Sequence, residues 1–391
     1  MEHFFAPCPR GLEAVLAQEL AALGAADIKA TEGGVHFTGA AALCYRANLE
    51  SRIASRILRH VVTAPYRSED DIYQATLALK WPLWFDVGNT IRVNVAALRC
   101  PLKSLDFVTL RIKDAICDRF REHGGKRPSV DTEHPDVRVH AFLTADRLTL
   151  YLDTTGEPLF KRGWRIASTE APLRENLAAG ILRLTGWTPG ETLLDPACGS
   201  GTLLVEAAMI ALDIAPGLRR SFAFEKLKNF EREAWHALRT AAVQRSQPVT
   251  PLGIHGSDLY GDTLKVAHAN LGHAGLAGAV TLKQANLLEI SPPALSGVLV
   301  ANLPYGVRSG DSAELLEFYP RLGDALKQRF AGWRAYLFSA DRELPKRIRL
   351  SVSKRIPLYN GALECRLLEY KIISGSMRAT KPSVARENGR S

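Results

Sequence analysis

The sequence contains few cysteines and no long hydrophobic run. Its six cysteines lie at positions 8, 44, 100, 117, 198 and 365, and no two of them have CxxC spacing. This pattern argues against a disulfide framework and against a structural zinc site. No uninterrupted apolar run reaches about 18 residues, the length that suggests a membrane span. The first residues, MEHFFAPCPR, lack the charged start and apolar stretch of a signal peptide. We therefore expect a cytoplasmic protein with reduced thiols.

The composition is ordinary except for a moderate basic excess. Hydrophobic residues make up 46% and charged residues 23% of the chain, which excludes a wholly disordered, collagen-like or coiled-coil protein. The net charge is +9, from 50 Lys and Arg against 41 Asp and Glu. The excess concentrates in residues 342–355 and after residue 376. It favours a polyanionic partner such as a nucleic acid, but charge alone leaves the partner open.

Three segments of the 391-residue chain differ in their residue patterns, and the length agrees with two or three domains. In residues 1–60, apolar spacing predicts helices over 11–23 and 41–58, with a short strand at 35–37 between them. Residues 61–165 interleave strands and helices in a second small α/β unit. Its expected helices are residues 72–79 and 105–120, and its expected strands are residues 90–96, 137–143 and 147–154.

The third unit, which we place at residues 166–376, has a different pattern. Short apolar strands alternate with helices, which is typical of a doubly wound, mostly parallel sheet of the α/β class. The expected strands are residues 192–194, 252–256, 280–284, 298–301 and 335–339, and the expected helices are residues 202–212, 262–274 and 313–330. In such sheets ligands bind beside the carboxyl ends of the strands.

Three further segments stand apart from that alternation. Residues 350–357 and 363–373 flank an Asn-Gly pair, which predicts an antiparallel hairpin at the end of the unit. Residues 213–250 are basic, aromatic and largely helical in pattern, so we expect a helical insertion there. The polar residues 377–391 are expected to form a disordered tail.

The clearest chemical signal is the run DPACGSGT at residues 195–202. It follows an expected strand and precedes an expected helix. Gly199 and Gly201 allow a tight turn and let a ligand lie against the backbone. No lysine follows, so this is not a phosphate loop of the Walker type. With Asp195 at its start, the turn favours a ligand that has an amino-acid end.

Two polar residues end the next two expected strands. Asp258 follows the second strand, where a carboxylate can accept hydrogen bonds from both hydroxyls of a ribose. Asn286 follows the third strand, and two interpretations stay open: it contacts an adenine edge, or it serves only a turn. Strand ends at this edge of a doubly wound sheet line the crevice where ligands bind.

The third signal, NLPYG at residues 302–306, ends the fourth strand. The side-chain oxygen of Asn302 and the carbonyl of Leu303 can both accept hydrogen bonds from a planar amino group. Pro304 fixes the turn. Tyr305 offers a flat face on which a base can stack, a contact that contributes about 1–3 kcal/mol. The motif therefore favours chemistry on the amino group of a base.

Together, DPACGSGT and NLPYG resemble the motifs of S-adenosylmethionine-dependent methyltransferases that modify exocyclic amines of bases. Residues 171–178, APLRENLA, resemble the element that these enzymes place over the cofactor. Residues 61–165, which end in LDTTGEPLFKRGWR, resemble a THUMP domain, an RNA-binding module. Residues 358–366, LYNGALECR, resemble the family's C-terminal hairpin. Almost the whole chain thus resembles the THUMP-domain RNA guanine-N2 methyltransferases, which act on 23S rRNA or tRNA.

The resemblance implies a fold, a cofactor and a set of site residues. The fold would be an α/β, Rossmann-like class I methyltransferase domain preceded by α+β ferredoxin-like and THUMP domains. S-adenosylmethionine would be bound by Pro172, Leu173, Asp195, Ala197, Cys198, Gly199, Gly201, Thr202, Asp258, Leu259, Asn286, Leu287 and Asn302. The catalytic residues would be Asn302, Leu303, Pro304 and Tyr305. RNA would contact Lys161, Arg162, Arg165, Arg111, Arg119, Lys346 and Arg347.

Two positions depart from the family pattern. Position 303 is leucine where the motif is usually Asn-Pro-Pro-Tyr, so the carbonyl is kept while the turn loses some rigidity. Position 260 is tyrosine where many relatives carry a second acid. Asp258 would then hold the ribose alone, and Tyr260 would pack on the adenine.

The implied reaction is methylation of the N2 amine of a guanine in RNA, with 23S rRNA favoured and tRNA as an alternative; no metal is implied. A second alternative is methylation of adenine N6 in DNA, against which the THUMP-like segment argues. A third is a non-catalytic RNA-binding factor in ribosome assembly. The intact Asp195, Asp258 and Asn302 argue against that interpretation, since they indicate that the site has not decayed.

Overall fold

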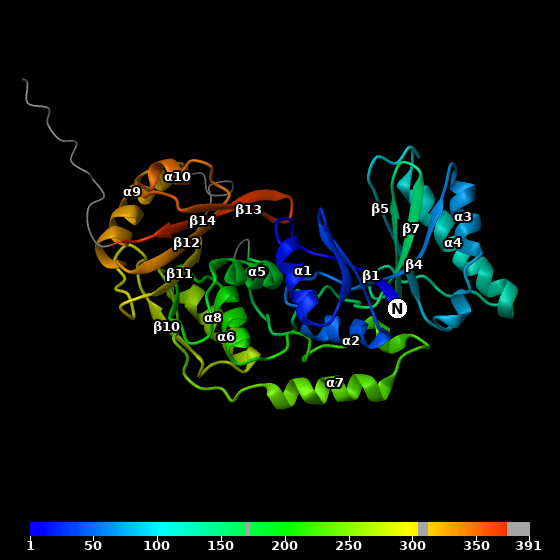
Figure 1. Ribbon diagram of the computed structural model, residues 1–391, viewed down its shortest axis with the longest axis horizontal. Helices are drawn as coiled ribbons and strands as arrows, with labels where there is room; N and C mark the ends of the chain where they lie inside the picture. Colours follow the sequence, from blue (N-terminus) through cyan, green and yellow to red (C-terminus); the bar gives the residue numbers. More distant parts are fainter. Residues whose placement is uncertain (169–171, 304–311, 374–391) are drawn as a thin grey trace, which may run out of the picture.

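The computed structural model describes residues 1–168, 172–303 and 312–373. Within them the chain forms two seven-stranded sheets, an N-terminal one in the right half of Figure 1 and a C-terminal one in the left half. No helix in these residues is both long and apolar enough to cross a membrane. The expected tail, residues 377–391, lies outside the described residues, as do Pro304 and Tyr305 of the third motif.

The N-terminal sheet combines the first two units of the chain. Its strands are β1 (Glu2–Pro7), β2 (Ala26–Thr31), β3 (Gly34–Gly39), β4 (Leu58–Pro65), β5 (Ile91–Ala97), β6 (Val137–Leu143) and β7 (Arg147–Asp153). Its helices are α1 (Glu13–Ala22), α2 (Ala41–Glu50), α3 (Glu69–Leu77), η1 (Trp81–Leu83) and α4 (Leu105–Gly124). The strand order is β2-β3-β1-β4-β7-β6-β5, and all neighbours are antiparallel except β5 and β6. Strands β1 and β2 were not expected from the sequence.

Strand β4 joins the two units into one sheet. Its start pairs with β1, where Leu58 lies opposite Phe5, and its whole length pairs with β7. The expected helix over residues 41–58 is therefore wrong in its second half, because α2 ends at Glu50 and Ser51 is already extended. The strand sequence LRHVVTAP carries two adjacent valines, whose branched side chains favour a strand, and pairing on both edges stabilises it.

Capping residues set the ends of the helices that cover this sheet. Ser104 begins α4, since its hydroxyl accepts a hydrogen bond from the Phe107 amide at 3.2 Å. Gly125 ends the same helix with φ +69°, a conformation that favours glycine. At the start of α3, Ser68 and Asp71 form a reciprocal capping box. These local signals explain why both helices were predictable from the sequence.

The C-terminal sheet has the doubly wound topology expected from the sequence. Its strands are β8 (Leu193–Asp195), β9 (Ile254–Asp258), β10 (Val280–Gln284), β11 (Gly297–Asn302), β12 (Trp333–Ser339), β13 (Lys354–Asn360) and β14 (Leu363–Lys371). Its helices are α5 (Glu175–Thr185), α6 (Thr202–Ala211), η2 (Ala223–Lys226), α7 (Arg232–Arg245), α8 (Gly261–Ala274), α9 (Ser312–Arg329) and α10 (Leu344–Arg347). The order is β10-β9-β8-β11-β12-β14-β13, parallel except for the antiparallel β14 and its hairpin partner β13. This confirms the predicted mostly parallel sheet with a C-terminal hairpin.

Helices cover both faces of this sheet, and β11 shows why its strands are apolar throughout. Val298 and Val300 belong to the core that includes α5, α6 and α8. Leu299 and Ala301 belong to a second core, on the opposite face, that includes α9. Because successive residues of a strand point to opposite faces, a strand buried on both sides needs an unbroken apolar run. Such a run, GVLVAN, leads to Asn302 at the edge of the sheet.

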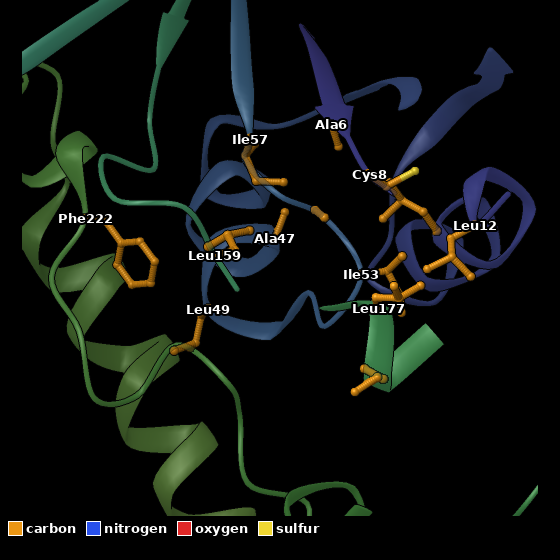
Figure 2. Close-up of a cluster of buried hydrophobic side chains, with 14 of the residues drawn as sticks. Ala6, Cys8, Leu12, Ala47, Leu49, Ile53, Ile57, Leu159, Leu177 and Phe222 are labelled. Carbon is orange, nitrogen blue, oxygen red and sulfur yellow. The ribbon is translucent and has the colours of Figure 1, made fainter. Parts of the chain in front are cut away.

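Separate parts of the chain meet in one hydrophobic junction between the two sheets (Figure 2). It is built from β1 and the residues after it, α2 and the loop after it, the segment after β7, α5, and the insertion. The residues labelled there are Ala6, Cys8, Leu12, Ala47, Leu49, Ile53, Ile57, Leu159, Leu177 and Phe222. The elements approach closely, since a Cβ added to Gly180 would lie 2.3 Å from Leu12 Cδ1. A continuous, close-packed core of this kind fixes the orientation of the two halves.

The insertion at residues 213–250 packs against the N-terminal half. It holds the short turn η2 and the helix α7, so it is helical only in part. Tyr45 of α2 lies against the rings of Phe224, Phe230 and Trp235. The aromatic residues that marked this segment in the sequence therefore serve the contact between the halves.

The six cysteines of the described chain are all free, as expected from their spacing. Five are buried, and Cys100 is half-buried. Burial raises the pKa of the Cys44 thiol to about 12, so this thiol stays protonated at neutral pH. Buried, protonated thiols of this kind act as small apolar side chains in the core.

The junction also holds a buried ion pair. Arg162 Nε donates to Glu206 Oε1 at 3.2 Å, and both side chains are almost fully buried. Its other nitrogens donate to the carbonyls of Leu159 at 2.8 Å and Arg52 at 2.6 Å. The expectation that Arg162 contacts RNA is therefore wrong, because its guanidinium is bound inside the protein and cannot reach a phosphate.

We predict that Glu206→Ala strongly destabilises the fold. The substitution leaves the Arg162 guanidinium buried without its carboxylate, and breaking a buried pair in this way costs about 3–5 kcal/mol. Urea unfolding followed by circular dichroism measures the loss. The control is Lys161→Ala, which removes an exposed pair with Glu157 and should cost at most about 1 kcal/mol. Equal losses in the two variants would contradict the importance of the buried pair.

Candidate active site

The DPACGSGT run forms a tight turn between β8 and α6, which we call the glycine loop (residues 196–201). Gly199 and Gly201 have φ values of +54° and +81°, which favour glycine over residues with a side chain. At Gly201 the chain also passes close to α8, since an added Cβ would lie 3.3 Å from the Cβ of Ala267. Helix α6 begins directly after the loop, at Thr202, so its first amides lack helical partners there.

The end of β9 holds the glycine loop in place. The Cys198 amide donates to the Ser257 carbonyl at 2.9 Å, and the Gly199 amide donates to Asp258 Oδ2 at 3.0 Å. The other carboxylate oxygen of Asp258 accepts from the Tyr260 amide at 3.1 Å. The glycine loop and Asp258, the first two signals of the sequence, therefore meet at one edge of the sheet. Asp258 is partly exposed to solvent there.

Asp195, the last residue of β8, is a buried carboxyl group with few partners. Only 2% of it is exposed, and Oδ1 accepts a single hydrogen bond, from the Ala197 amide at 3.3 Å. Burial raises the pKa of Asp195 to about 8; the negative charge of Asp258 acts in the same direction and the Ala197 amide acts against it. A cation placed beside Asp195 would lower that pKa, so this carboxyl suits a ligand with an ammonium group.

Arg165 ties the glycine loop to the segment before α5. Its Nη1 donates to Ser200 Oγ at 2.9 Å, and its Nη2 donates to Thr202 Oγ1 at 2.8 Å. Its Nε donates to Glu175 Oε1 at 2.8 Å, and Nη2 also reaches the Leu173 carbonyl at 3.3 Å. The expectation that Arg165 contacts RNA is therefore wrong, because every nitrogen of its guanidinium is bound at the glycine loop or beside it.

This positioning role of Arg165 was missed from the sequence. Its partners lie up to 37 residues further along the chain, and only folding brings them together. The one signal that could have indicated it is Glu175, an acid among the apolar residues of the following helix. Burial raises the pKa of Glu175 while the charge of Arg165 lowers it, so the pair depends on both partners.

Asn302 ends β11, between β8 and β12, at the same carboxyl edge of the sheet. Its side-chain Oδ1 is buried and has no hydrogen-bond partner among the described residues. The Leu303 amide donates to the Phe338 carbonyl at 3.1 Å, a bond that a proline could not make. The Leu303 side chain lies in the hydrophobic cluster that includes α9. A hydrogen bond and core packing thus hold position 303, where the family motif has the first of its two prolines.

Asn286 serves a turn. Its Oδ1 accepts from the Leu288 amide at 3.0 Å, and its Nδ2 donates to Glu289 Oε1 at 3.3 Å. Of the two interpretations left open by the sequence, the geometry supports the turn. A contact between Asn286 and an adenine edge stays a prediction.

The remaining expected cofactor residues differ in accessibility. Leu259 is 51% exposed, and Tyr260 beside it is 68% exposed, so both can meet a ligand at the surface of this edge. Pro172 is exposed as well. Leu173 and Leu287 are buried, so only their backbone groups or the rims of their side chains can reach a ligand.

Two of the arginines expected to bind RNA also connect α4 to α3 or to the residues after it. Arg111 of α4 pairs with Asp70 of α3 at 2.8 Å, and its guanidinium stacks on the ring of Tyr73. Arg119 donates to the Leu79 carbonyl at 3.2 Å, beyond the end of α3. Binding of phosphate by either side chain would break these partly exposed contacts, and RNA binding by Arg111 and Arg119 stays a prediction.

The other expected RNA contacts are more accessible. Lys161 and Lys346 form only exposed pairs, with Glu157 at 2.6 Å and Glu343 at 2.7 Å, and such pairs break at little cost. Arg347 is half-buried. RNA binding by these three residues stays a prediction.

The chemistry of this edge fits S-adenosylmethionine. Asp195 offers a carboxyl group to an ammonium ion, and Asp258 offers two oxygens to ribose hydroxyls. The glycine loop leaves backbone free of side chains at Gly199 and Gly201. The unpartnered Oδ1 of Asn302 adds an acceptor for a second, amine-bearing molecule at the same edge.

We predict that Arg165→Met weakens the binding of S-adenosylhomocysteine at least about tenfold. The variant loses the hydrogen bonds to the glycine loop and to Glu175, and one hydrogen bond to a charged group contributes about 1.5–3 kcal/mol. Isothermal titration calorimetry measures the dissociation constant. The control is Arg183→Met, which removes an exposed arginine from the last turn of α5 and should bind as the wild type. Unchanged affinity in R165M would contradict the positioning role.

We predict that Asp195→Asn changes how stability depends on pH. The pKa of this carboxyl is about 8 in the folded protein against 3.8 as an ordinary group, so the folded state binds the extra proton between these values. The stability of the wild type relative to D195N should therefore fall as pH rises, by up to about 1.4 kcal/mol per unit. Thermal unfolding of both proteins between about pH 5.5 and 7.5 tests this. Parallel pH profiles would contradict the raised pKa.

Comparison with known families agrees with this geometry. Residues 3–58 match the RlmL ferredoxin-like domain, residues 66–153 match the THUMP domain, and residues 162–369 match the RMKL-like methyltransferase domain. A protein of Synechocystis sp. named as an RNA methyltransferase is 40% identical over 94% of this chain and 96% of its own length. The ribosomal RNA large subunit methyltransferase K/L of Shewanella sp. strain ANA-3 is 39% identical over 98% of this chain. The chain spans about half the length of that relative, 54%.

A solved structure shows the same architecture. A methyltransferase crystallised with S-adenosylhomocysteine superposes with a TM-score of 0.88 and 31% identity, over 96% of this chain and 99% of that one. The matches confirm the resemblance drawn from the sequence, together with S-adenosylmethionine as the cofactor of the family. The chain therefore belongs to the family of RMKL-like methyltransferases that carry a ferredoxin-like and a THUMP domain before the methyltransferase domain.

Proposed function

We propose that this protein methylates the exocyclic N2 amine of a guanine in RNA, with 23S rRNA as the favoured substrate. The observation that carries the proposal is the buried Oδ1 of Asn302, an acceptor without a partner among the described residues, at the end of β11. Buried polar atoms normally have partners, so a lone acceptor at a ligand-binding edge indicates a group that arrives with the substrate. An amine with two N–H donors is such a group.

The residues at the end of β11 act on the target amine. The N2 lone pair of guanine is delocalised into the ring, so the amine is a weak nucleophile. Asn302 Oδ1 and the Leu303 carbonyl accept its two N–H groups, which aims the lone pair and stabilises the positive charge that develops on nitrogen. No base is needed before transfer, because the nitrogen becomes acidic only afterwards. S-adenosylmethionine, when bound, supplies the electrophilic methyl group.

The remaining residues position the two reactants. Asp258 takes the ribose hydroxyls and Asp195 the ammonium group, both next to the glycine loop that Arg165 fixes. Holding the reactants in line contributes a large part of the rate enhancement of a transfer of this kind. The target base has to leave its stack to reach this edge, as for other enzymes that modify bases.

The RNA substrate is supported by the domain content and by the relatives. A THUMP domain precedes the methyltransferase domain, and the sequence carries a net charge of +9. The K/L relatives are named for a substrate in the large ribosomal subunit, and this chain matches about half of their length. These findings favour 23S rRNA over tRNA, and RNA over DNA.

The proposal is tested by methyl transfer from radiolabelled S-adenosylmethionine to rRNA and tRNA from cells that lack this gene, followed by nucleoside analysis. Label in N2-methylguanosine of large-subunit rRNA supports the proposal. Label in tRNA keeps the reaction and changes the substrate, and label in N6-methyladenosine contradicts the choice of base. Cofactor binding without any labelled RNA would favour a non-catalytic RNA-binding factor.

We predict that Asn302→Ala lowers the rate of methyl transfer at least about 100-fold, the loss expected when one preorganised group at the reacting centre is removed. Because the resemblance places Asn302 among the cofactor residues as well, calorimetry with S-adenosylhomocysteine is needed to separate a loss of methyl transfer from a loss of cofactor binding. The matched control is Asn89→Ala, which removes an asparagine from a surface turn and should keep full activity. An active N302A variant would show that the amine is oriented by other groups.

A further inference from the structure

The N-terminal sheet is covered by helices on one face only. On β7, Leu148, Leu150 and Leu152 are buried in the core that also contains side chains of α3 and α4. The alternate residues, Thr149 and Tyr151, lie on the opposite face. In Figure 1, α3 and α4 lie on one side of β4, β5 and β7, and no helix of the described chain covers the other side.

The uncovered face carries a row of ring side chains, which we call the ring surface. Phe5 of β1 lies opposite His36 of β3, with ring centroids 4.6 Å apart. Tyr151 of β7 lies opposite His60 of β4, with centroids 5.9 Å apart, and it is 6.0 Å from the ring of Phe5. The ring surface consists of His3, Phe5, His36, His60, His140, Phe142 and Tyr151.

Part of the ring surface is open to solvent. Phe142 is 39% exposed, and His3 and His36 are exposed. The apolar patch continues beyond β5, because Ala96 lies opposite Phe142 and the nearby Leu98 is 61% exposed. The solvent face of an antiparallel sheet is usually polar, so exposed rings on several strands mark a surface that meets a partner.

The charge around the ring surface suits a polyanion. Lys29 of β2 and Arg147 at the start of β7 are exposed, and no ion pair of the described residues includes either of them. Asp153 is fully buried against two basic side chains. Asp27, at the far edge of the sheet, accepts a hydrogen bond from the Thr38 hydroxyl at 2.8 Å. Two cations without an ion pair among the described residues therefore flank the rings, and the carboxylates of Asp153 and Asp27 already have partners.

Two imidazoles of the ring surface, those of His36 and His60, favour the uncharged form. Burial lowers the pKa of His36, and the charge of Lys29 lowers it further. Burial also lowers the pKa of His60, as do the neighbouring His3 and His36. The exposed rings of His3, His36 and Phe142 offer faces for stacking, whereas Tyr151 is only 7% exposed. The flanking cations offer contacts to phosphates.

We propose that the ring surface binds an unpaired stretch of the RNA substrate by stacking its bases on these rings. The inference rests on the proposed function, since it describes a second place, outside the methyl-transfer site, where the protein holds the same RNA. An unpaired strand is the fitting partner because its bases are free to stack on aromatic side chains, whereas a duplex keeps its base faces covered.

The test is fluorescence anisotropy with the full chain and a labelled 12-nucleotide single-stranded RNA, compared with a duplex of the same sequence. The variant Phe142→Ala/His36→Ala removes two exposed rings and leaves the core intact. We expect its dissociation constant for the single strand to rise about tenfold or more. The matched control is Phe107→Ala/His134→Ala, which removes an exposed phenylalanine (49%, against 39% for Phe142) and an exposed histidine outside the ring surface.

Each outcome decides between the proposals. A loss confined to the ring-surface variant and to the single strand supports the inference. If the ring-surface variant binds the single strand with wild-type affinity, the inference is overturned and the proposed function stands. The same holds if the variant loses equal affinity for the duplex, because that would show that the rings contact no bases. Failure of the wild-type protein to bind any RNA would overturn the proposed function as well. Circular dichroism and calorimetry with S-adenosylhomocysteine confirm that the variants are folded.

Discussion

The contact between Arg165 and the glycine loop is the one on which the candidate site depends. The loop contains two glycines with positive φ, so by itself it has many conformations available. The guanidinium of Arg165 restricts it by binding Ser200 and Thr202 while it also holds Glu175. Three segments that are far apart in sequence are thereby fixed in one geometry beside Asp195.

The same short segment fixes the N-terminal half. Arg162, three residues before Arg165, is buried with Glu206 of α6 and binds two backbone carbonyls of the N-terminal half. The segment between the THUMP domain and the methyltransferase domain is therefore no flexible linker. Through one helix, α6, it connects the position of the N-terminal half with the shape of the glycine loop.

The sequence was sufficient for the parts of the molecule that local chemistry determines. Strands buried on both faces appear as short apolar runs, such as GVLVAN before Asn302, and the glycine loop follows from its glycines. The exposed β2 and the paired β4 were missed or misjudged, because their stability comes from neighbouring strands rather than from their own pattern. The domain limit at residue 60 stays a prediction, and β4 crosses it.

The roles of the arginines could not be predicted for a different reason. A basic residue in a sequence can face solvent, a phosphate or a carboxylate, and the choice depends on partners brought in by folding. Arg162 and Arg165 pair with carboxylates that lie 44 and 10 residues further along the chain, and Arg111 pairs with one that lies 41 residues before it. The basic excess indicated a negatively charged partner, but it did not identify which side chains contact that partner.

Strand β4 makes the N-terminal half a single cooperative unit. It is hydrogen-bonded to β1 on one edge and to β7 on the other, so neither the ferredoxin-like part nor the THUMP part can separate without exposing a strand edge of the other. The two parts meet at the start of β4, where Leu58 and Arg59 pair both with β1 and with β7, so hydrogen exchange at this start reports on the opening of both parts. The two small domains defined by family comparison therefore share one folding unit, and a substitution that destabilises either domain also destabilises the other.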